Sequence, residues 1–335
     1  MSFVKYDKRW ISLLVYAFLL SFNPFTIPLL GKTIASTGVD WTLIEDDSNV
    51  GSLTDDYQVK EEAALRRELG CLSDVPIAAE TESWNWHLLP DGLLWRSYLA
   101  GPHEPRISMV IFRNSDDEWF WDAVIGGRVG LLRYGTSGSN RPQGWQWDLE
   151  GAVMTRLDLQ NSEDVESMDY RFGTDITAAE GPWGMRLGYY HISSHVGDEY
   201  IERNPLFERI NYVTESFVIA LSYSPTASTR YYGEFANSFR TSGGARRYQY
   251  QTGFEYTPIA KVPSRGAPYA AINVHLREAV DYDAATTLQV GWGWQGQSSG
   301  RRLRVGLQYG QGPTSQYEFF QRREEYLGCG VWFDY

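Results

Sequence analysis

The final stretch of the chain, Leu327–Tyr335, alternates strictly between two kinds of residue. One face of an extended strand would carry Leu327, Cys329, Val331, Phe333 and Tyr335, and the other would carry Gly328, Gly330, Trp332 and Asp334. Because successive side chains on a strand point to opposite faces, this period of two predicts a β-strand with one apolar face. The same alternation recurs back to Ile107, so β-strands dominate the fold that this sequence can adopt.

The opposite face of these alternating segments is polar and carries both signs of charge. In one segment Leu149 and Val153 share a face, while Asp148 and Glu150 share the other. The sequence contains about twelve such segments, an even number typical of bacterial barrels, and many approach the ~10 residues that a tilted membrane strand needs. We therefore predict an all-β fold over residues 106–335. It is an antiparallel transmembrane β-barrel of about 12 strands, and its lumen is crossed by ion pairs.

Composition agrees with a barrel and leaves one other fold class open. The mean hydropathy of −0.38 is low, as expected when only every second strand residue faces lipid. Aromatic residues make up 15% of the chain and would supply the interfacial girdles of a barrel. In the alternative, a secreted soluble β protein, the same Trp and Tyr residues would stack on carbohydrate. The net charge of −12 argues against a nucleic-acid partner, which requires clustered Lys and Arg.

The N-terminus has the order of a secretory signal peptide. Three basic residues precede the apolar run Trp10–Leu30, and small residues follow it. A membrane-anchoring helix is the alternative, but Pro24 and Pro28 would interrupt it. We predict a signal peptide over 1–37 that directs export, followed by a periplasmic lead-in or plug segment over 38–105.

Residues Trp84–Arg106 form a block rich in Trp, Leu, Pro and Gly. This block resembles an uncharacterised bacterial outer-membrane-type family, domain of unknown function 1207, and the resemblance extends to the C-terminus. It implies an outer-membrane protein but no activity. Pro102 and Pro105 exclude a central strand here, so we expect an amphipathic loop or plug at the periplasmic mouth of the barrel.

The last strand and the loop lengths also bear on localisation. An alternating strand that ends on an aromatic residue resembles the closing strand of bacterial outer-membrane barrels, which implies recognition by the barrel-assembly machinery. The long connections Ser194–Tyr212 and Gln311–Glu325 fall on one side, and the short Ser224–Arg230 and Gln297–Gly300 turns fall on the other. Since such barrels have long outer loops and short periplasmic turns, we predict a location in the outer membrane of a Gram-negative envelope, in contact with its lipids.

One motif on the predicted outer wall could carry chemistry. His191 and Ser193 share a face near the outer end of a strand, which would let the histidine act as base toward the serine hydroxyl. Asn211 or Glu215 on the returning strand could orient the imidazole. This His-x-Ser pattern is similar to that of the outer-membrane phospholipase A and lipid A deacylase barrels, whose motif faces the outer leaflet. The resemblance implies lipid acyl hydrolysis.

The function itself stays open at this stage. One interpretation is a structural barrel or a narrow passive pore, in which His191 and Ser193 are ordinary interfacial residues. The other is an outer-leaflet lipid acyl hydrolase that uses the four residues above, and calcium is the cofactor expected in that case. His195 with Asp198, Glu199 and Glu202 would suit a hard cation or a solvated acidic loop.

Overall fold

The computed structural model describes residues 83–138, 140–260, 262–296 and 298–335. The predicted signal peptide and most of the predicted periplasmic segment lie outside these residues. All of these residues belong to the unit Val59–Tyr335; the other unit, Met1–Gln58, lies entirely outside them.

Strands account for most of the described chain. They are β1 (Asn85–Leu88), β2 (Ile107–Asn114), β3 (Trp119–Gly135), β4 (Gly144–Asp158), β5 (Asp164–Glu180), β6 (Trp183–Val196), β7 (Val213–Tyr223), β8 (Thr229–Ser242), β9 (Tyr248–Tyr256), β10 (Ala267–Arg277), β11 (Ala284–Gln295), β12 (Arg302–Pro313) and β13 (Arg323–Asp334). The short helical elements are α3 (Asp198–Arg203), η1 (Pro263–Arg265), η2 (Glu278–Val280) and η3 (Tyr317–Phe319). Among the described residues, no helix has the length and apolar character needed to cross a membrane.

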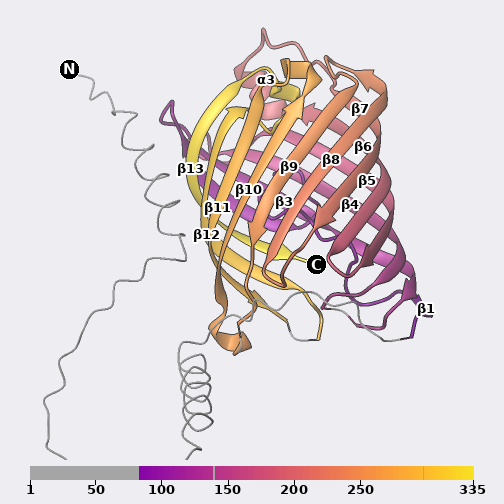
Figure 1. Cartoon of the computed structure of the whole chain (residues 1–335). Coiled ribbons are helices and arrows are strands. Elements are labelled where there is room, and N and C mark those ends of the chain that lie inside the picture. Colours follow the sequence, from indigo (N-terminus) through magenta and orange to yellow (C-terminus); the bar gives the residue numbers. More distant parts are fainter. Residues whose placement is uncertain (1–82, 139, 261, 297) are drawn as a thin grey trace, which may run out of the picture. The chain divides into compact units, whose positions relative to one another are not determined.

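The strands β2–β13 close into a barrel, which confirms the predicted fold (Figure 1). Each strand pairs antiparallel with its neighbours in sequence, and β13 returns to pair with β2, so that Phe333 lies opposite Ile107. Closure leaves no unpaired sheet edge between these twelve strands, as a wall in lipid requires. The extra strand β1 pairs with the end of β3 beyond the reach of β2, with Asn85 opposite Gly135.

The alternation read in the sequence divides the wall into an apolar exterior and a polar interior. Ile125 is 72% exposed and Phe217 is 60% exposed on the outer face. Their neighbours of the opposite parity, such as Arg128, Glu150 and Arg186, are 2% exposed or less. An apolar outer band with a polar interior is the arrangement of a membrane barrel and the reverse of a soluble one.

The two ends of the barrel differ in the length of their connections. The loop end carries the β6–β7 connection with α3 and the β12–β13 connection with η3, and it lies at the top of Figure 1. The turn end carries the tight β5–β6 connection and the C-terminus. The two long connections and the two short turns named from the sequence lie at opposite ends, as predicted. The separation by length is incomplete, because the β2–β3, β4–β5 and β8–β9 connections at the loop end are shorter than the β3–β4 and β9–β10 connections at the turn end.

Residues Leu93–Arg106, which we call the luminal segment, run inside the barrel ahead of β2. Trp95, Tyr98 and Leu99 are 3% exposed or less, and Tyr98 stacks on Tyr232 of β8 with ring centroids 3.9 Å apart. The segment therefore reaches deeper than the mouth position expected from the sequence, and it fills the space between opposite walls.

Candidate functional site

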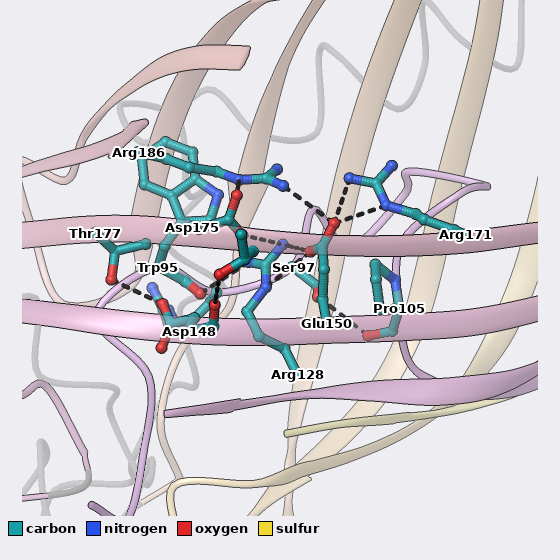
Figure 2. A network of polar contacts seen from close by, with 12 residues as sticks. Trp95, Ser97, Pro105, Arg128, Asp148, Glu150, Arg171, Asp175, Thr177 and Arg186 are labelled. Atoms are coloured by element: carbon teal, nitrogen blue, oxygen red, sulfur yellow. Dashed lines mark hydrogen bonds and ion pairs between the residues drawn. The ribbon is translucent and has the colours of Figure 1, made fainter. Parts of the chain in front are cut away.

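A network of buried ion pairs occupies the middle of the lumen (Figure 2). Glu150 of β4 accepts hydrogen bonds from Arg128 Nε at 3.0 Å, Arg171 Nε at 2.8 Å and Arg186 Nη2 at 3.2 Å. Arg186 also donates to Asp175 at 2.9 Å. Since buried charges are tolerated when they are paired and hydrogen-bonded, these contacts explain why the interior can be so polar.

Asp148 is held differently from its neighbour Glu150. Both residues share the luminal face of β4, but Asp148 accepts hydrogen bonds from Gln146 at 2.5 Å and Thr177 at 2.8 Å. The side chains that donate hydrogen bonds to Asp148 are therefore neutral ones.

The luminal segment is fastened to the wall through its main chain and its side chains. Arg128 donates to the carbonyl of Trp95 at 3.2 Å, and the amide of Leu99 donates to Glu255 at 2.8 Å. Near the loop end, His103 Nε2 lies 3.1 Å from Asp169 Oδ2. The cavities that remain around His103 hold only about 20 Å³ each. In this state the lumen is closed at that level, so the outer wall and the two ends are the accessible surfaces.

A polar row crosses the outer wall at the edge of its apolar band. His191 of β6 is the direct cross-strand partner of Glu215 of β7, and Glu215 is the partner of Arg240 of β8. His191 Nδ1 lies 4.0 Å from Glu215 Oε1, and Arg240 Nη1 lies 2.8 Å from the same oxygen. The structure therefore brings together two of the four predicted site residues across adjacent strands.

The other two predicted residues are placed less closely. Ser193 lies two residues from His191 on the same outer face, opposite Val213, and no hydrogen bond joins its hydroxyl to a residue within the described ranges. Asn211 precedes β7 with φ of 52° and is exposed. No contact between Asn211 and His191 is present in the described part of the chain, which leaves Glu215 as the group beside the imidazole.

Three aromatic rings lie below this row, toward the turn end. Phe217 follows Glu215 by two residues on β7, and Tyr189 precedes His191 by two residues on β6. The third ring, Phe239, packs on Phe217 with ring centroids 4.8 Å apart and also lies near Tyr189. Tyr189 OH lies 3.5 Å from Glu215 Oε2. The rings separate the polar row from the more apolar middle of the wall.

A shallow groove of about 400 Å³ opens on the outer wall beside His191. Ile125, Val153, Tyr170 and Phe172 contribute apolar side chains to it, and Gly151 has none to contribute. Phe172 is the cross-strand partner of both Gly151 and His191. The missing side chain at Gly151 therefore leaves room for a chain-like apolar group that reaches the imidazole.

Arg240 is the functional neighbour that the sequence pattern misplaces. Its even number would place it inside with Arg230 and Ser238, but a β-bulge shifts the register between Glu215 and Ser216, so that Arg240 faces outward opposite Glu215. Bulges re-aim side chains in this way. No alternation pattern could have revealed the bulge, because Phe239 fits an outward strand position equally well.

The acidic loop after β6 does not form a metal cluster. Asp198 instead pairs with Arg209 at 2.8 Å. Throughout the described residues, no group of three or more His, Cys, Asp or Glu side chains is arranged to hold a metal ion.

The comparisons with known proteins identify the family. The model of the family described as "Protein of unknown function (DUF1207)" matches residues 57–335. The chain belongs to this family. A search of the curated proteins finds no match.

Solved structures with a similar fold include several outer-membrane barrels. Outer membrane phospholipase A from Escherichia coli is 12% identical, with a TM-score of 0.45 over 68% of this chain and 90% of that one. The calcium-bound dimer of the Salmonella typhi phospholipase is 14% identical, with a TM-score of 0.46 over 68% and 91%. A mutant of the Rh. blastica porin is 10% identical, with a TM-score of 0.29 over 69% and 98%.

Proposed function

We propose that this protein is an integral outer-membrane barrel that works at its outer wall, where Ser193, His191 and Glu215 hydrolyse acyl esters of membrane lipids. The observation that carries the proposal is the cross-strand pair of His191 and Glu215, 4.0 Å apart, with Ser193 on the same outer face. A nucleophile, a base and a group that orients the base are the three parts that acyl transfer needs.

The membrane location is supported by the distribution of side chains on the wall. On β7 the outward residues Phe217, Ile219 and Leu221 are more than half exposed, and burial of such side chains requires lipid or another apolar surface. The band ends at the row formed by His191, Glu215 and Arg240. Charged groups facing lipid cost only about 0–1 kcal/mol near the interface but more at the midplane, so this row fits the level of the outer lipid headgroups. The predicted signal peptide would bring the chain there.

The chemistry proceeds in two steps. The Ser193 hydroxyl rotates toward His191, gives its proton to the imidazole and attacks the ester carbonyl, and the alcohol then leaves with that proton. Water repeats the sequence on the acyl-serine, and releases the fatty acid. Glu215, whose Oε1 lies 4.0 Å from His191 Nδ1, stabilises the imidazolium that forms in each step through its negative charge.

The groove beside His191 supports a lipid as the substrate. It lies on the apolar wall, its volume is about 400 Å³, and its lining includes His191 itself. An acyl chain in this groove would lie along Phe172 and over Gly151, with its ester at the level of the polar row. Calcium prefers carboxylate and phosphate oxygens, and comparison of acyl release with and without calcium tests whether the ion takes part.

The test is acyl release from phospholipid and lipopolysaccharide micelles by the refolded chain, with and without calcium. We expect release that disappears in Ser193→Ala and in His191→Ala. Ser115→Ala, which removes an exposed hydroxyl from the β2–β3 turn, is the matched control and should keep full activity. Heat-modifiable gel mobility verifies folding of each variant. Absence of release from folded wild-type barrel in both lipids would refute the proposal.

A further inference from the structure

The turn end of the lumen contains a cavity of about 80 Å³, and every charged side chain in its described lining is an arginine. Three arginines from separate elements face it: Arg96 of the luminal segment, Arg141 of the β3–β4 connection and Arg230 of β8. Its described lining includes no Asp or Glu side chain. This contrasts with the middle of the lumen, where Glu150 and Asp175 balance the arginines.

The existing contacts of these arginines leave part of their charge uncompensated. Arg230 lies 3.5 Å from Glu255, which also accepts the amide of Leu99. Arg141 donates to the carbonyl of Ala227, a neutral group. The guanidinium of Arg96 makes no ion pair or hydrogen bond with any residue in the described ranges. Burial, together with the nearby Arg96 and Arg230 charges, lowers the pKa of Arg141 well below its usual value, so a bound anion would relieve repulsion here.

Two hydroxyl groups complete the cavity wall. Ser222 faces inward at the turn end of β7, and Ser224 follows that strand. Both residues line the cavity, and each is 9% exposed. Neither hydroxyl has a hydrogen-bond partner in the described part of the chain. Guanidinium and hydroxyl donors that converge on one small space are the groups that bind phosphate and carboxylate oxygens.

A second, larger cavity adjoins the first. Its volume is about 370 Å³, it shares Asn140 and Gln295 with the first cavity, and its lining is more apolar, with Ile259 and Trp294 among the residues. Arg302 and Arg304 are its charged residues, and its described lining also includes no carboxylate. A ligand with an anionic group in the first cavity could therefore place an apolar part in the second.

We propose that the turn end of the lumen is a binding site for a phosphate-sized oxyanion, held by Arg96, Arg141 and Arg230 with the hydroxyls of Ser222 and Ser224. The site is separate from the polar row on the outer wall and does not depend on it. The oxyanion can belong to a free phosphate or to a phospholipid headgroup, since both present the same oxygens to the arginines.

The experiment is isothermal titration calorimetry on the refolded full chain in an uncharged detergent at low salt. One arm uses inorganic phosphate and the other uses a short-chain phosphatidylglycerol below its critical micelle concentration. We expect saturable binding with one site per chain that is at least about tenfold weaker in Arg96→Gln and in Arg141→Gln, because each substitution removes one charge-assisted contact with the oxyanion. Arg246→Gln, which removes an exposed charge from the β8–β9 connection at the loop end, should bind like wild type.

The two titrations distinguish free phosphate from a phospholipid headgroup, and the variants show whether the binding depends on the proposed site. Binding in both arms, or of the phosphatidylglycerol alone, supports an oxyanion site and tells whether the lipid part is required. Absence of saturable binding in both arms, or equal weakening by Arg246→Gln, overturns it. Because Arg96 lies in the luminal segment, its variant could fail to fold; Ser222→Ala and Arg141→Gln then provide the same comparison in chains verified by gel mobility.

Discussion

Arg106 and Asp334 form an ion pair at the seam between the first and last strands of the barrel, with Arg106 Nη1 3.2 Å from Asp334 Oδ1. Arg106 is the residue immediately before β2, and Asp334 is the last residue of β13. Asp334 also accepts from Arg304 Nε at 2.6 Å. The Asp334 carboxylate thus links β13 to the luminal segment through Arg106 and to β12 through Arg304, at the seam where the barrel closes.

Substitution Asp334→Asn should destabilise the barrel strongly. It would leave Arg106 and Arg304, which are 2% exposed or less, without their carboxylate, and removal of one partner from a buried ion pair typically costs about 3–5 kcal/mol. The free energy of unfolding in detergent, from urea titration followed by Trp fluorescence, measures the effect. Asp116→Asn in the exposed β2–β3 turn should change it by less than about 0.5 kcal/mol; equal effects would contradict the role of the seam.

Glu215→Gln should lower acyl hydrolysis by roughly a hundredfold or more, since an amide cannot stabilise the imidazolium as a carboxylate does. Initial rates on a dispersed ester substrate measure this. Glu325→Gln is the matched control, because Glu325 also faces outward near the loop end, where it accepts from Tyr309 OH at 2.9 Å. Wild-type rates in Glu215→Gln would remove Glu215 from the proposed mechanism.

Gly151→Leu should shift the preference of the proposed hydrolase toward short acyl chains. A Cβ at Gly151 would meet only the Arg171 carbonyl oxygen, at 3.7 Å, so the barrel should accept the side chain while the groove is filled. We expect the ratio of kcat/KM for long over short esters to fall several-fold. The ratio should remain constant in Leu149→Ala, which changes an outward residue on the same strand outside the groove lining. An unchanged ratio in Gly151→Leu would exclude the groove as the acyl site.

The luminal segment should determine whether the barrel conducts ions. Wild-type protein in planar bilayers is expected to show no steady conductance, because the segment fills the lumen. Replacement of Trp95–Ala100 by glycine and serine removes the Tyr98 stack on Tyr232 and the bond from Tyr98 to Glu234, so conducting events should appear. Replacement of the exposed residues 202–206, which lie outside the lumen, by glycine and serine is the control. Steady conductance of the wild type would show that the segment leaves an open path.

His103→Ala should loosen the luminal segment near the loop end. His103 contacts Asp169 and packs on Tyr317 with ring centroids 4.4 Å apart. Hydrogen exchange should therefore become faster in residues 97–105, because local opening costs less. His195→Ala, on the exposed outer face, should leave exchange in this segment unchanged. Equal exchange in wild type and His103→Ala would mean that other contacts suffice.

The wall of the barrel was predictable because lipid and lumen impose a strict period of two. The spacing of Leu149, Glu150 and Val153 directly predicts that Leu149 and Val153 face outward and that Glu150 faces the lumen. The path of the luminal segment was harder to predict, since Pro102 and Pro105 exclude a central strand but do not determine the position of the segment in the barrel. Its depth depends on contacts with distant strands, such as the bond from Leu99 to Glu255.

The candidate site was predictable only in part, for a related reason. His191 and Ser193 share a face by spacing alone, but the choice between Asn211 and Glu215 depends on the register between β6 and β7. That register and the bulge that turns Arg240 outward are properties of strand pairing. The charge imbalance at the turn end likewise becomes visible only when Arg96, Arg141 and Arg230 are brought together by the fold.

The luminal segment has a consequence for the order of assembly. Arg128, Glu255 and Arg304 each contact its main chain, so an empty cylinder would hold charged groups in need of water. We therefore expect the wall and the luminal segment to exchange hydration for protein contacts in the same folding step. Because the luminal segment precedes β2 in the chain, it offers the later strands a core to pack around, and the seam between β2 and β13 then closes the barrel.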